Sequence, residues 1–427
     1  MTDFNRRQLL GAGLAASATL TLPGFAAAQV NRNAPARVVV VGGGFGGATA
    51  ARYLKLFDPS LEVTLIDRDA LYTTCPFSNY VLAGVRSLDS IQHRRDPLQQ
   101  RWGVKLVRAS ATAIDTGAKR VRLADGAVLP YDKLVVAPGI ELNYGGVPGY
   151  SEKGAERVPH AWKAGAQTAL LRRQLEAMPD GGTVIIAPPA NPFRCPPGPY
   201  ERVSMIAWYL KTKKPKSKIL IFDAKDAFSK QGLFQAAWES EYPGMITWVA
   251  GKDGGKVEEV DVANLSIKAG FGTEKANVLN LIPPQTAGKI AIDAGLAESN
   301  GWCAVDPKNF ASRKAADVHV LGDASIAGAM PKSGSAANSQ AKVVAAAIVA
   351  SLRGQAAPPA VFHNTCYSLV SPDYGISVTG TYRPGETVAE VPNSGGVSPA
   401  RADAAFRKQE AEHTLGWYAG IIADSFG

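Results

Sequence analysis

A glycine-rich turn between a predicted strand and a predicted helix constrains the fold of this chain more than any other feature of its sequence. Residues 37–41 read RVVVV, a continuous β-branched run that is typical of a buried parallel strand. Gly42, Gly44 and Gly47 follow at once with the spacing G-x-G-x-x-G. A helical segment is predicted to follow them over residues 48–57. This order of elements predicts an α/β domain in which helices cover a parallel sheet.

Each glycine of this turn has its own role in a nucleotide-binding domain. Gly42 permits the tight turn, Gly44 lets the backbone approach a pyrophosphate, and Gly47 allows the helix to pack closely on the strand. The N-terminus of the helix attracts the phosphates. A second strand is predicted over 62–67 and ends on Asp67, 20 residues after Gly47, where a carboxylate can accept hydrogen bonds from ribose hydroxyls. Together these features predict a dinucleotide-binding domain.

Two later segments favour FAD over NAD as the dinucleotide. Residues 134–139 read LVVAPG and resemble a strand and turn of the flavoproteins that have two dinucleotide-binding domains. Residues 318–324 read VHVLGDA and resemble the second flavin motif of those proteins, in which a strand delivers an aspartate to the ribitol of FAD. Asp323 is the candidate for that role. We therefore expect an α/β fold with two doubly wound Rossmann domains, like that of glutathione reductase.

The second predicted Rossmann unit lacks the features of a nicotinamide site. Its first strand is predicted over 183–186, but the segment that follows, 187–198, reads APPANPFRCPPG and contains no G-x-G-x-x-G. Prolines also remove backbone N–H donors from the turn that would hold a pyrophosphate. We expect this domain to keep the architecture without an NAD site.

Four cysteines are widely separated in the sequence, at Cys75, Cys195, Cys303 and Cys366. This spacing excludes C-x-x-C metal sites and C-x-x-C-H haem attachment, and five scattered histidines give a metal site no support. Cys195 lies between prolines where a nucleotide would otherwise bind, which favours a redox role for its sulfur.

The first residues predict an export signal. Residues 5–10 read NRRQLL, a twin-arginine pattern, an apolar stretch continues to about residue 22, and Ala26 to Ala28 supply an A-x-A cleavage site. We expect a signal peptide over 1–28 and a periplasmic protein exported by the twin-arginine pathway. No later apolar run is long enough to predict a membrane span.

The charge of the chain gives no support to nucleic-acid binding. The formal net charge of +9 is modest for 427 residues and is spread along the chain. The longest basic cluster, at 211–218, has no interleaved aromatic residue and is predicted to be a solvated loop before a strand. A mildly basic surface still suits an acidic protein partner.

Six short segments are more specific than these general patterns. They are 72–75 (YTTC), 135–142 (VVAPGIEL), 159–165 (PHAWKAG), 192–202 (PFRCPPGPYER), 280–285 (NLIPPQ) and 364–368 (NTCYS). They resemble the flavoprotein subunit of flavocytochrome c sulfide dehydrogenase, a sulfide:cytochrome c oxidoreductase. The resemblance implies an FAD-binding domain in two parts, 35–148 and 289–360, a second dinucleotide-binding-like domain over 149–288, and a C-terminal interface domain over 361–427.

The resemblance also implies roles for individual residues. Cys75 matches the cysteine that bonds to the 8α-methyl carbon of the flavin, and the alternative is a buried bystander thiol. Cys195 and Cys366 match a redox-active disulfide, and the alternative is a structural bridge that ties the second domain to the C-terminal region. Glu201 matches a proposed proton-transfer group, and the alternative is a surface or salt-bridged glutamate. Cys303 is predicted to be a buried free thiol.

The activity implied is oxidation of hydrogen sulfide to sulfane sulfur or polysulfide, with electrons passed through FAD to a cytochrome. Because the chain has no C-x-x-C-H, the haem must come from a separate c-type cytochrome subunit. Residues 361–427 are the expected docking surface. Trp417 and Tyr418 are candidate contacts, unless they pack in the core of a terminal helix.

Two other functions remain open from the sequence. A sulfide:quinone oxidoreductase would share the fold and the disulfide chemistry but needs a membrane-binding surface. The stretch 402–427 contains four acidic residues, which favours a packed helix over one lying on an anionic membrane. The other alternative is a flavin-bearing assembly or redox-sensor protein without turnover.

Overall fold

The valine-rich run before the glycine turn forms the middle strand of a five-stranded parallel sheet. The structure is a computed structural model that describes residues 34–427, so the predicted signal peptide at 1–28 lies outside the described residues. The strand order is β20-β9-β1-β2-β5, and every neighbouring pair is parallel. The strands are β1 (Arg37–Val41), β2 (Glu62–Ile66), β5 (Lys105–Val107), β9 (Lys133–Val136) and β20 (Val318–Val320).

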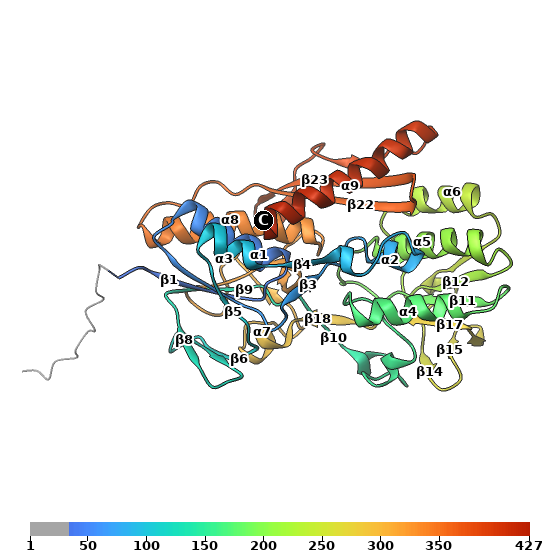
Figure 1. Ribbon diagram of the computed structural model, residues 1–427, viewed down its shortest axis with the longest axis horizontal. Coiled ribbons are helices and arrows are strands. Elements are labelled where there is room, and N and C mark those ends of the chain that lie inside the picture. Colours follow the sequence, from blue (N-terminus) through green and yellow to red (C-terminus); the bar gives the residue numbers. More distant parts are fainter. Residues whose placement is uncertain (1–33) are drawn as a thin grey trace, which may run out of the picture. The chain divides into compact units, whose positions relative to one another are not determined.

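Helices and a small antiparallel sheet cover the two faces of this first sheet. Figure 1 shows α1 and α8 on one side of it and the strands β6 and β8 on the other. The valines of β1 are buried on both faces, as the continuous apolar run predicts. The covering elements are α1 (Phe45–Phe57), α8 (Gly334–Leu352), α3 (Asp96–Trp102), β6 (Ala111–Asp115), β7 (Arg120–Leu123) and β8 (Val128–Pro130).

The second predicted Rossmann unit forms a four-stranded parallel sheet in the order β13-β12-β11-β17. These strands are β11 (Thr183–Ala187), β12 (Lys218–Phe222), β13 (Ile246–Val249) and β17 (Val278–Leu281). The helices of this unit are α4 (Ala166–Ala177), α5 (Gly198–Lys213) and α6 (Gln231–Glu241), and it also carries an antiparallel sheet of β14 (Glu259–Asp261), β15 (Ser266–Ala269) and β16 (Gly272–Lys275). The two parallel sheets confirm the predicted α/β fold class.

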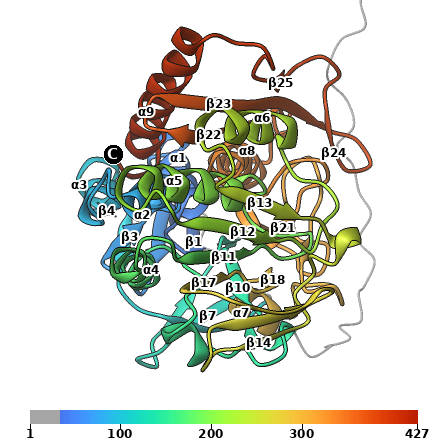
Figure 2. The ribbon, with the colours of Figure 1, turned by 90° about the vertical axis from the view of Figure 1, so that its right-hand side faces the viewer.

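The C-terminal region is a long β-hairpin followed by a helix. Strand β22 contacts α8 of the first unit and both α5 and α6 of the second, so the hairpin joins the two units (Figure 2). Helix α9 packs along the hairpin and ends against α1. The elements are β22 (Phe362–Ser371), β23 (Tyr374–Pro384), β24 (Val388–Glu390), β25 (Gly396–Val397) and α9 (Ala404–Phe426).

Short elements connect these units. They are β3 (Leu71–Thr73), α2 (Ser78–Ala83), β4 (Gln92–Arg94), β10 (Ile140–Leu142), β18 (Gln285–Ala287), α7 (Lys289–Asp293), β19 (Cys303–Ala304) and β21 (Ser325–Ile326). Within residues 34–427, no helix combines the length and the apolar character that crossing a membrane requires.

A buried polar cluster fixes the end of α9 to the first unit. The side-chain amide of Asn338 on α8 donates hydrogen bonds to Thr49 Oγ1 at 3.0 Å, Asp424 Oδ2 at 2.8 Å and Ser425 Oγ at 3.2 Å. Asn338, Thr49 and Ser425 are all buried, so these hydrogen bonds satisfy polar groups that water does not reach.

Replacing Asn338 with alanine should therefore destabilise the whole protein. The change removes the hydrogen bonds that the Asn338 amide donates within a buried polar cluster, so we expect a loss of about 1–3 kcal/mol in the free energy of unfolding. Urea unfolding followed by circular dichroism measures this loss. Ser351→Ala changes an exposed side chain of the same helix and should cost less than about 0.5 kcal/mol. Equal stabilities of the two variants would contradict the proposed anchoring role.

Candidate functional site

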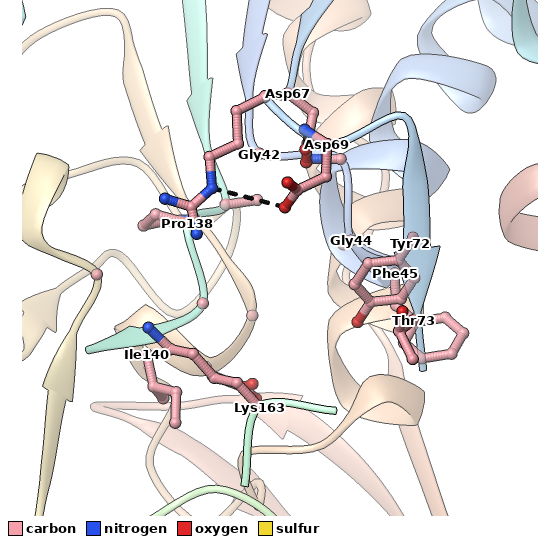
Figure 3. A pocket seen from close by; sticks show the side chains of 18 of the residues that line it. Gly42, Gly44, Phe45, Asp67, Asp69, Tyr72, Thr73, Pro138, Ile140 and Lys163 are labelled. Carbon is pink, nitrogen blue, oxygen red and sulfur yellow. Dashed lines mark hydrogen bonds and ion pairs between the residues drawn. The ribbon is translucent and has the colours of Figure 1, made fainter. Parts of the chain in front are cut away.

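A cavity of about 840 Å³ lies at the carboxyl ends of the strands of the first sheet. In Figure 3, Asp67 and Asp69 lie at the upper end of this cavity and Ile140 and Lys163 at the lower end. Five of the nine residues predicted for the site line it: Gly42, Gly44, Asp67, Cys75 and Asp323. Tertiary structure thus gathers segments that are up to a few hundred residues apart in the sequence.

The glycine turn has the geometry that its sequence predicts. Gly42 has a φ of +97°, and a Cβ added there would lie 2.3 Å from the carbonyl oxygen of Ala137. A Cβ on Gly47 would lie 1.8 Å from the carbonyl oxygen of Gly42, so Gly47 provides the close packing of helix on strand. Gly44 precedes α1 and offers no side-chain cap, which leaves the first N–H groups of the helix available for an anion.

Asp67 is held against this turn by hydrogen bonds and an ion pair. Its Oδ2 accepts from the backbone N–H of Gly43 at 2.7 Å and lies 3.1 Å from the guanidinium of Arg95. Arg95 also donates through Nε to the carbonyl oxygen of Gly43 at 2.6 Å. Sequence reasoning missed Arg95, because nothing in its local sequence indicates that it is buried against a turn 52 residues earlier.

Asp323 presents an unpaired buried oxygen at the cavity. Its Oδ1 has no hydrogen-bond partner among the described residues, and its Oδ2 lies 3.9 Å from the guanidinium of Arg194. Burial raises the pKa of Asp323, while Arg194 acts to lower it. An unpaired buried acceptor requires a donor, and the hydroxyls of a ribitol chain are suitable donors. The donors of the glycine turn and the acceptor of Asp323 therefore fit FAD.

Cys75 lines the same cavity on the segment between β3 and α2. Its Sγ lies 3.5 Å from the carbonyl oxygen of Trp162. The neighbouring Thr74 is buried, and its hydroxyl lies 2.8 Å from the hydroxyl of Tyr418 on α9. The Tyr418 hydroxyl also lies 2.8 Å from His93 Nε2. Tyr418 is thus packed in the core, as the alternative interpretation of this residue predicts, and it steadies the segment that carries Cys75.

Cys195 and Cys366 belong to one cluster although they come from distant parts of the chain; Cys195 is partly buried and Cys366 is buried. Cys195 precedes α5 and has a φ of +55°, a left-handed conformation that is costly for a residue with a side chain. Cys366 is buried on β22. Burial raises the pKa of the Cys195 thiol, and the nearby Cys366 and Glu201 raise it further. All four cysteines are free thiols in the structure, so the bridge between Cys195 and Cys366 stays a prediction.

Glu201 lies in the first turn of α5 and is partly buried. Its Oε1 accepts from the backbone N–H of Leu369 on β22 at 3.1 Å, and its Oε2 accepts from Asn79 Nδ2 at 3.0 Å. Burial raises the pKa of Glu201, and these two hydrogen bonds act to lower it. No cation lies within 4.0 Å of the Glu201 carboxylate among residues 34–427, so the described residues do not make it a salt-bridged glutamate. A partly buried carboxyl with a raised pKa beside two thiols is able to carry a proton, and this role of Glu201 stays a prediction.

Three further residues of this cluster were missed by sequence reasoning. Arg202 is buried and donates to the carbonyl oxygens of His160 and Ala161, which ties that loop to α5. Lys230 is buried against β22, and Asn364 contacts the sulfur of Cys366. Arg202 and Asn364 lie inside the specific segments 192–202 and 364–368, but Lys230 has no local signal.

The second unit fills its own nucleotide position with side chains. Asp223 follows β12 as Asp67 follows β2, yet Asp223 is fully buried. Its carboxylate accepts from the Tyr200 hydroxyl at 2.5 Å, from Lys225 Nζ at 2.6 Å and from Trp248 Nε1 at 3.1 Å. Lys225 also donates to a carbonyl oxygen of the proline-rich segment. These contacts support the prediction that this unit has no NAD site.

Comparisons with known proteins agree with this site. Three family models match the chain: the central part of the sulfide dehydrogenase (flavocytochrome c) flavoprotein chain at 168–283, the flavocytochrome c sulphide dehydrogenase flavin-binding domain at 358–426, and pyridine nucleotide-disulphide oxidoreductase at 36–176. The sulfide dehydrogenase flavoprotein chain of Chlorobaculum thiosulfatiphilum is 62% identical over 45 residues, which cover 10% of this chain and 94% of that sequence.

More distant proteins share parts of the sequence or the fold. The probable ferredoxin reductase CtmF of Castellaniella defragrans is 35% identical over 129 residues, and the match spans about a third of its length (32%) and 30% of this chain. The solved structure of the sulfide:quinone oxidoreductase from Aquifex aeolicus superposes with a TM-score of 0.70 at 20% identity, covering 91% of this chain and 92% of that one. The two flavocytochrome models and the Chlorobaculum relative confirm the resemblance seen in the sequence: the chain belongs to the flavoprotein family of flavocytochrome c sulfide dehydrogenase, a family of flavin-binding oxidoreductases.

Proposed function

We propose that this protein oxidises hydrogen sulfide to sulfane sulfur or polysulfide and passes the electrons to a c-type cytochrome subunit in the periplasm. The observation that carries the proposal is the position of the thiol cluster. Cys366 is buried, Cys195 and Glu201 are partly buried beside it, and Arg194 next to Cys195 lines the cavity that fits FAD. The relatives named for sulfide dehydrogenase and sulfide:quinone oxidoreductase supply the substrate class.

Different residues of this chain would hold different parts of FAD. The glycine turn and the N-terminus of α1 would hold the pyrophosphate, Asp67 the ribose, and Asp323 the ribitol. Cys75 would form a thioether to the flavin. When bound, FAD supplies the acceptor for two electrons. Glu201 would carry the proton, and the cysteines of the chain would carry out the sulfur chemistry.

Sulfide oxidation begins, in this proposal, with the Cys195–Cys366 bridge closed. A hydrosulfide ion attacks Cys195 Sγ, a new S–S bond forms, and the electron pair of the broken bridge stays on Cys366 as a thiolate. A second hydrosulfide takes the outer sulfur from the persulfide, which releases a disulfide anion and leaves two reduced cysteines. Closing the bridge again would release two electrons and the remaining thiol protons from the cysteine pair, and FAD, when bound, would supply the acceptor for those electrons.

The electrons then need a one-electron acceptor outside this chain. A c-type haem attaches through C-x-x-C-H, which this sequence lacks, so a separate cytochrome subunit would supply it. In the structure α9 packs on the hairpin, and its Glu410 is buried and paired with Arg407. This packing favours a protein partner over the membrane surface that a quinone reductase requires.

Removing either sulfur of the cluster should abolish sulfide oxidation. Cys195→Ser and Cys366→Ser each delete an atom that disulfide exchange requires, so sulfide-driven bleaching of the flavin should slow by a factor of at least about a thousand. Stopped-flow absorbance under argon measures the rate. FAD should remain bound, because its contacts lie elsewhere.

Cys303→Ala is the matched control, because Cys303 is a buried thiol outside the cluster and should be dispensable for turnover. NADH should bleach the flavin slowly in every variant, since the second unit offers no glycine-lined turn. Near-parental rates in either serine variant would make the bridge structural. A protein whose flavin never responds to sulfide would be the sensor or assembly protein instead.

Cys75 should carry the flavin covalently. Acid precipitation should leave yellow flavin on the parent protein, and Cys75→Ala should release essentially all of it into the supernatant. The variant should still bind FAD before denaturation, because the turn and Asp323 are unchanged. Cys303→Ala should retain its flavin. Release of the flavin from the parent protein would remove the covalent link from the proposal.

The C-terminal region should hold the cytochrome. A stable complex is expected to bury more than about 1,000 Å². Leu415→Glu places a charge on an exposed apolar side chain of α9 and should weaken the complex about tenfold or more, as measured by calorimetry. Phe271→Glu changes an exposed residue of the second unit and should have no effect. A flavoprotein that elutes alone from the native periplasm and reduces quinones faster than cytochromes would favour the quinone-reductase alternative.

A further inference from the structure

Lys230 is a buried lysine that sequence reasoning gave no role. It precedes α6 in the second unit and lies against β22 of the C-terminal region. Its ammonium donates to the Ser368 hydroxyl at 2.8 Å and to the carbonyl oxygens of Cys366 at 3.0 Å and Ile376 at 3.5 Å. All three hydrogens of the ammonium thus have acceptors on the hairpin of β22 and β23, and Cys366 lies on β22.

These acceptors provide hydrogen bonds to the ammonium of Lys230, but they are neutral and supply no opposite charge. No carboxylate lies within 4.0 Å of the ammonium in the described part of the chain, and the titratable groups that influence it are Cys366, Glu201, Cys195 and Glu410. The backbone of Lys230 has a φ of +61°, a costly left-handed conformation. A buried cation without an ionic partner is strongly destabilising. The cost of holding Lys230 in this place and in a strained conformation therefore points to a functional role for its charge.

Asn364 approaches the same cysteine from the sulfur side. Its Nδ2 lies 3.4 Å from Cys366 Sγ, within the range of a hydrogen bond to sulfur. Ser333 sets the orientation of the amide, because its hydroxyl oxygen accepts from the backbone N–H of Ala336 at 3.0 Å and its hydrogen is left to donate to Asn364 Oδ1 at 2.6 Å. The amide oxygen thus accepts from Ser333 and can also accept from the Cys366 thiol, whose Sγ lies 3.6 Å away, while the amide N–H can donate to the same sulfur once it is a thiolate.

We propose that Lys230 and Asn364 are positioning residues that stabilise the negative sulfur of Cys366 when the Cys195–Cys366 bridge opens. The inference rests on the proposed function, which makes Cys366 the leaving thiolate. Breaking the bridge by hydrosulfide transfers an electron pair to Cys366 Sγ and creates a negative charge in a buried place. Asn364 donates a hydrogen bond to that charge, and Lys230 supplies the opposite charge beside it.

The protonation of Lys230 agrees with this role. Burial lowers the pKa of Lys230 to about 8, and its neighbours Cys366, Glu201 and Cys195 act to raise it. An amine with this pKa is mainly protonated at neutral pH, so it provides a positive charge where the thiolate forms. Because the oxidised bridge carries no charge, the pair should favour the open, reduced form of the cysteines over the closed form.

The redox equilibrium of the bridge tests the proposal directly. The holoenzyme is equilibrated under argon with glutathione buffers, quenched in acid, denatured and alkylated, and mass spectrometry gives the ratio of closed to open Cys195–Cys366. Lys230→Met should lower the equilibrium constant for reduction about tenfold, because a charged neighbour changes the stability of an ionised group by roughly that factor or more. Lys230→Arg retains the charge and should restore most of the loss.

Asn364→Asp is the second variant, because it keeps the shape of the side chain and places a negative charge at the sulfur. It should lower the equilibrium constant at least as much as Lys230→Met. Lys214→Met is the matched control: Lys214 also donates to backbone carbonyl oxygens, but it follows the far end of α5, about 24 Å along the helix from the end near Cys195. It should leave the equilibrium unchanged.

The possible outcomes distinguish the positioning role of Lys230 and Asn364 from the proposed function. Parental equilibrium constants in both Lys230→Met and Asn364→Asp would overturn the positioning role while leaving the proposed function intact. The equilibrium constant for reduction of the bridge can fall in these variants as expected while sulfide fails to bleach the flavin of the parent protein. That result would support the positioning role and overturn the proposed function. Absence of any Cys195–Cys366 bridge in the oxidised parent would overturn both.

Discussion

The placement of β22 across the two Rossmann-like units is the constraint on which the rest of the candidate site depends. The strand packs on α5 and α6 of one unit and on α8 of the other. The carboxylate of Glu201 accepts a hydrogen bond from the backbone N–H of Leu369 on this strand. The backbone N–H of Cys195 donates to the carbonyl oxygen of Lys332 at 2.7 Å, and Lys332 lies just before α8. These contacts bring Cys366 to the start of α5 and place both thiols beside the cavity wall. A shift of β22 by one residue would turn Cys366 to the other face of the hairpin.

The two units use the same topology for opposite purposes. In the first unit the acid after the second strand faces a cavity and is held to a glycine turn. In the second unit the equivalent Asp223 is enclosed by Tyr200, Lys225 and Trp248. Proline-rich sequence that contains Cys195 replaces the glycine turn there. The second unit thus contributes a thiol, a carboxyl and a buried lysine to the site of the first.

Much of the fold and of the site was predictable from local sequence. The glycine turn, Asp67 and Asp323 were predicted because each belongs to a strand-turn pattern whose chemistry is read within a few residues. Arg95, Lys230 and the role of Asn364 were not predictable in this way. Arg95 and Lys230 act on residues that are 52 and 136 positions away, and Asn364 needs Ser333 to orient its amide. Their local sequences resemble those of ordinary surface or strand residues. The assignment of Tyr418 was left open for the same reason, and its burial against Thr74 and His93 decides it.

The sequence by itself determined the α/β class, the nucleotide-binding turn, the absence of a second glycine turn and the family to which the chain belongs. These properties depend on periodicity and on short motifs, in which the residues that act together are neighbours in the chain. Only the tertiary structure decided which buried groups surround the thiols, because burial and hydrogen bonding there join β22, α5, α6 and α8. A lysine becomes a buried cation without a counter-ion only when a strand from another region covers it, and no local pattern specifies that event.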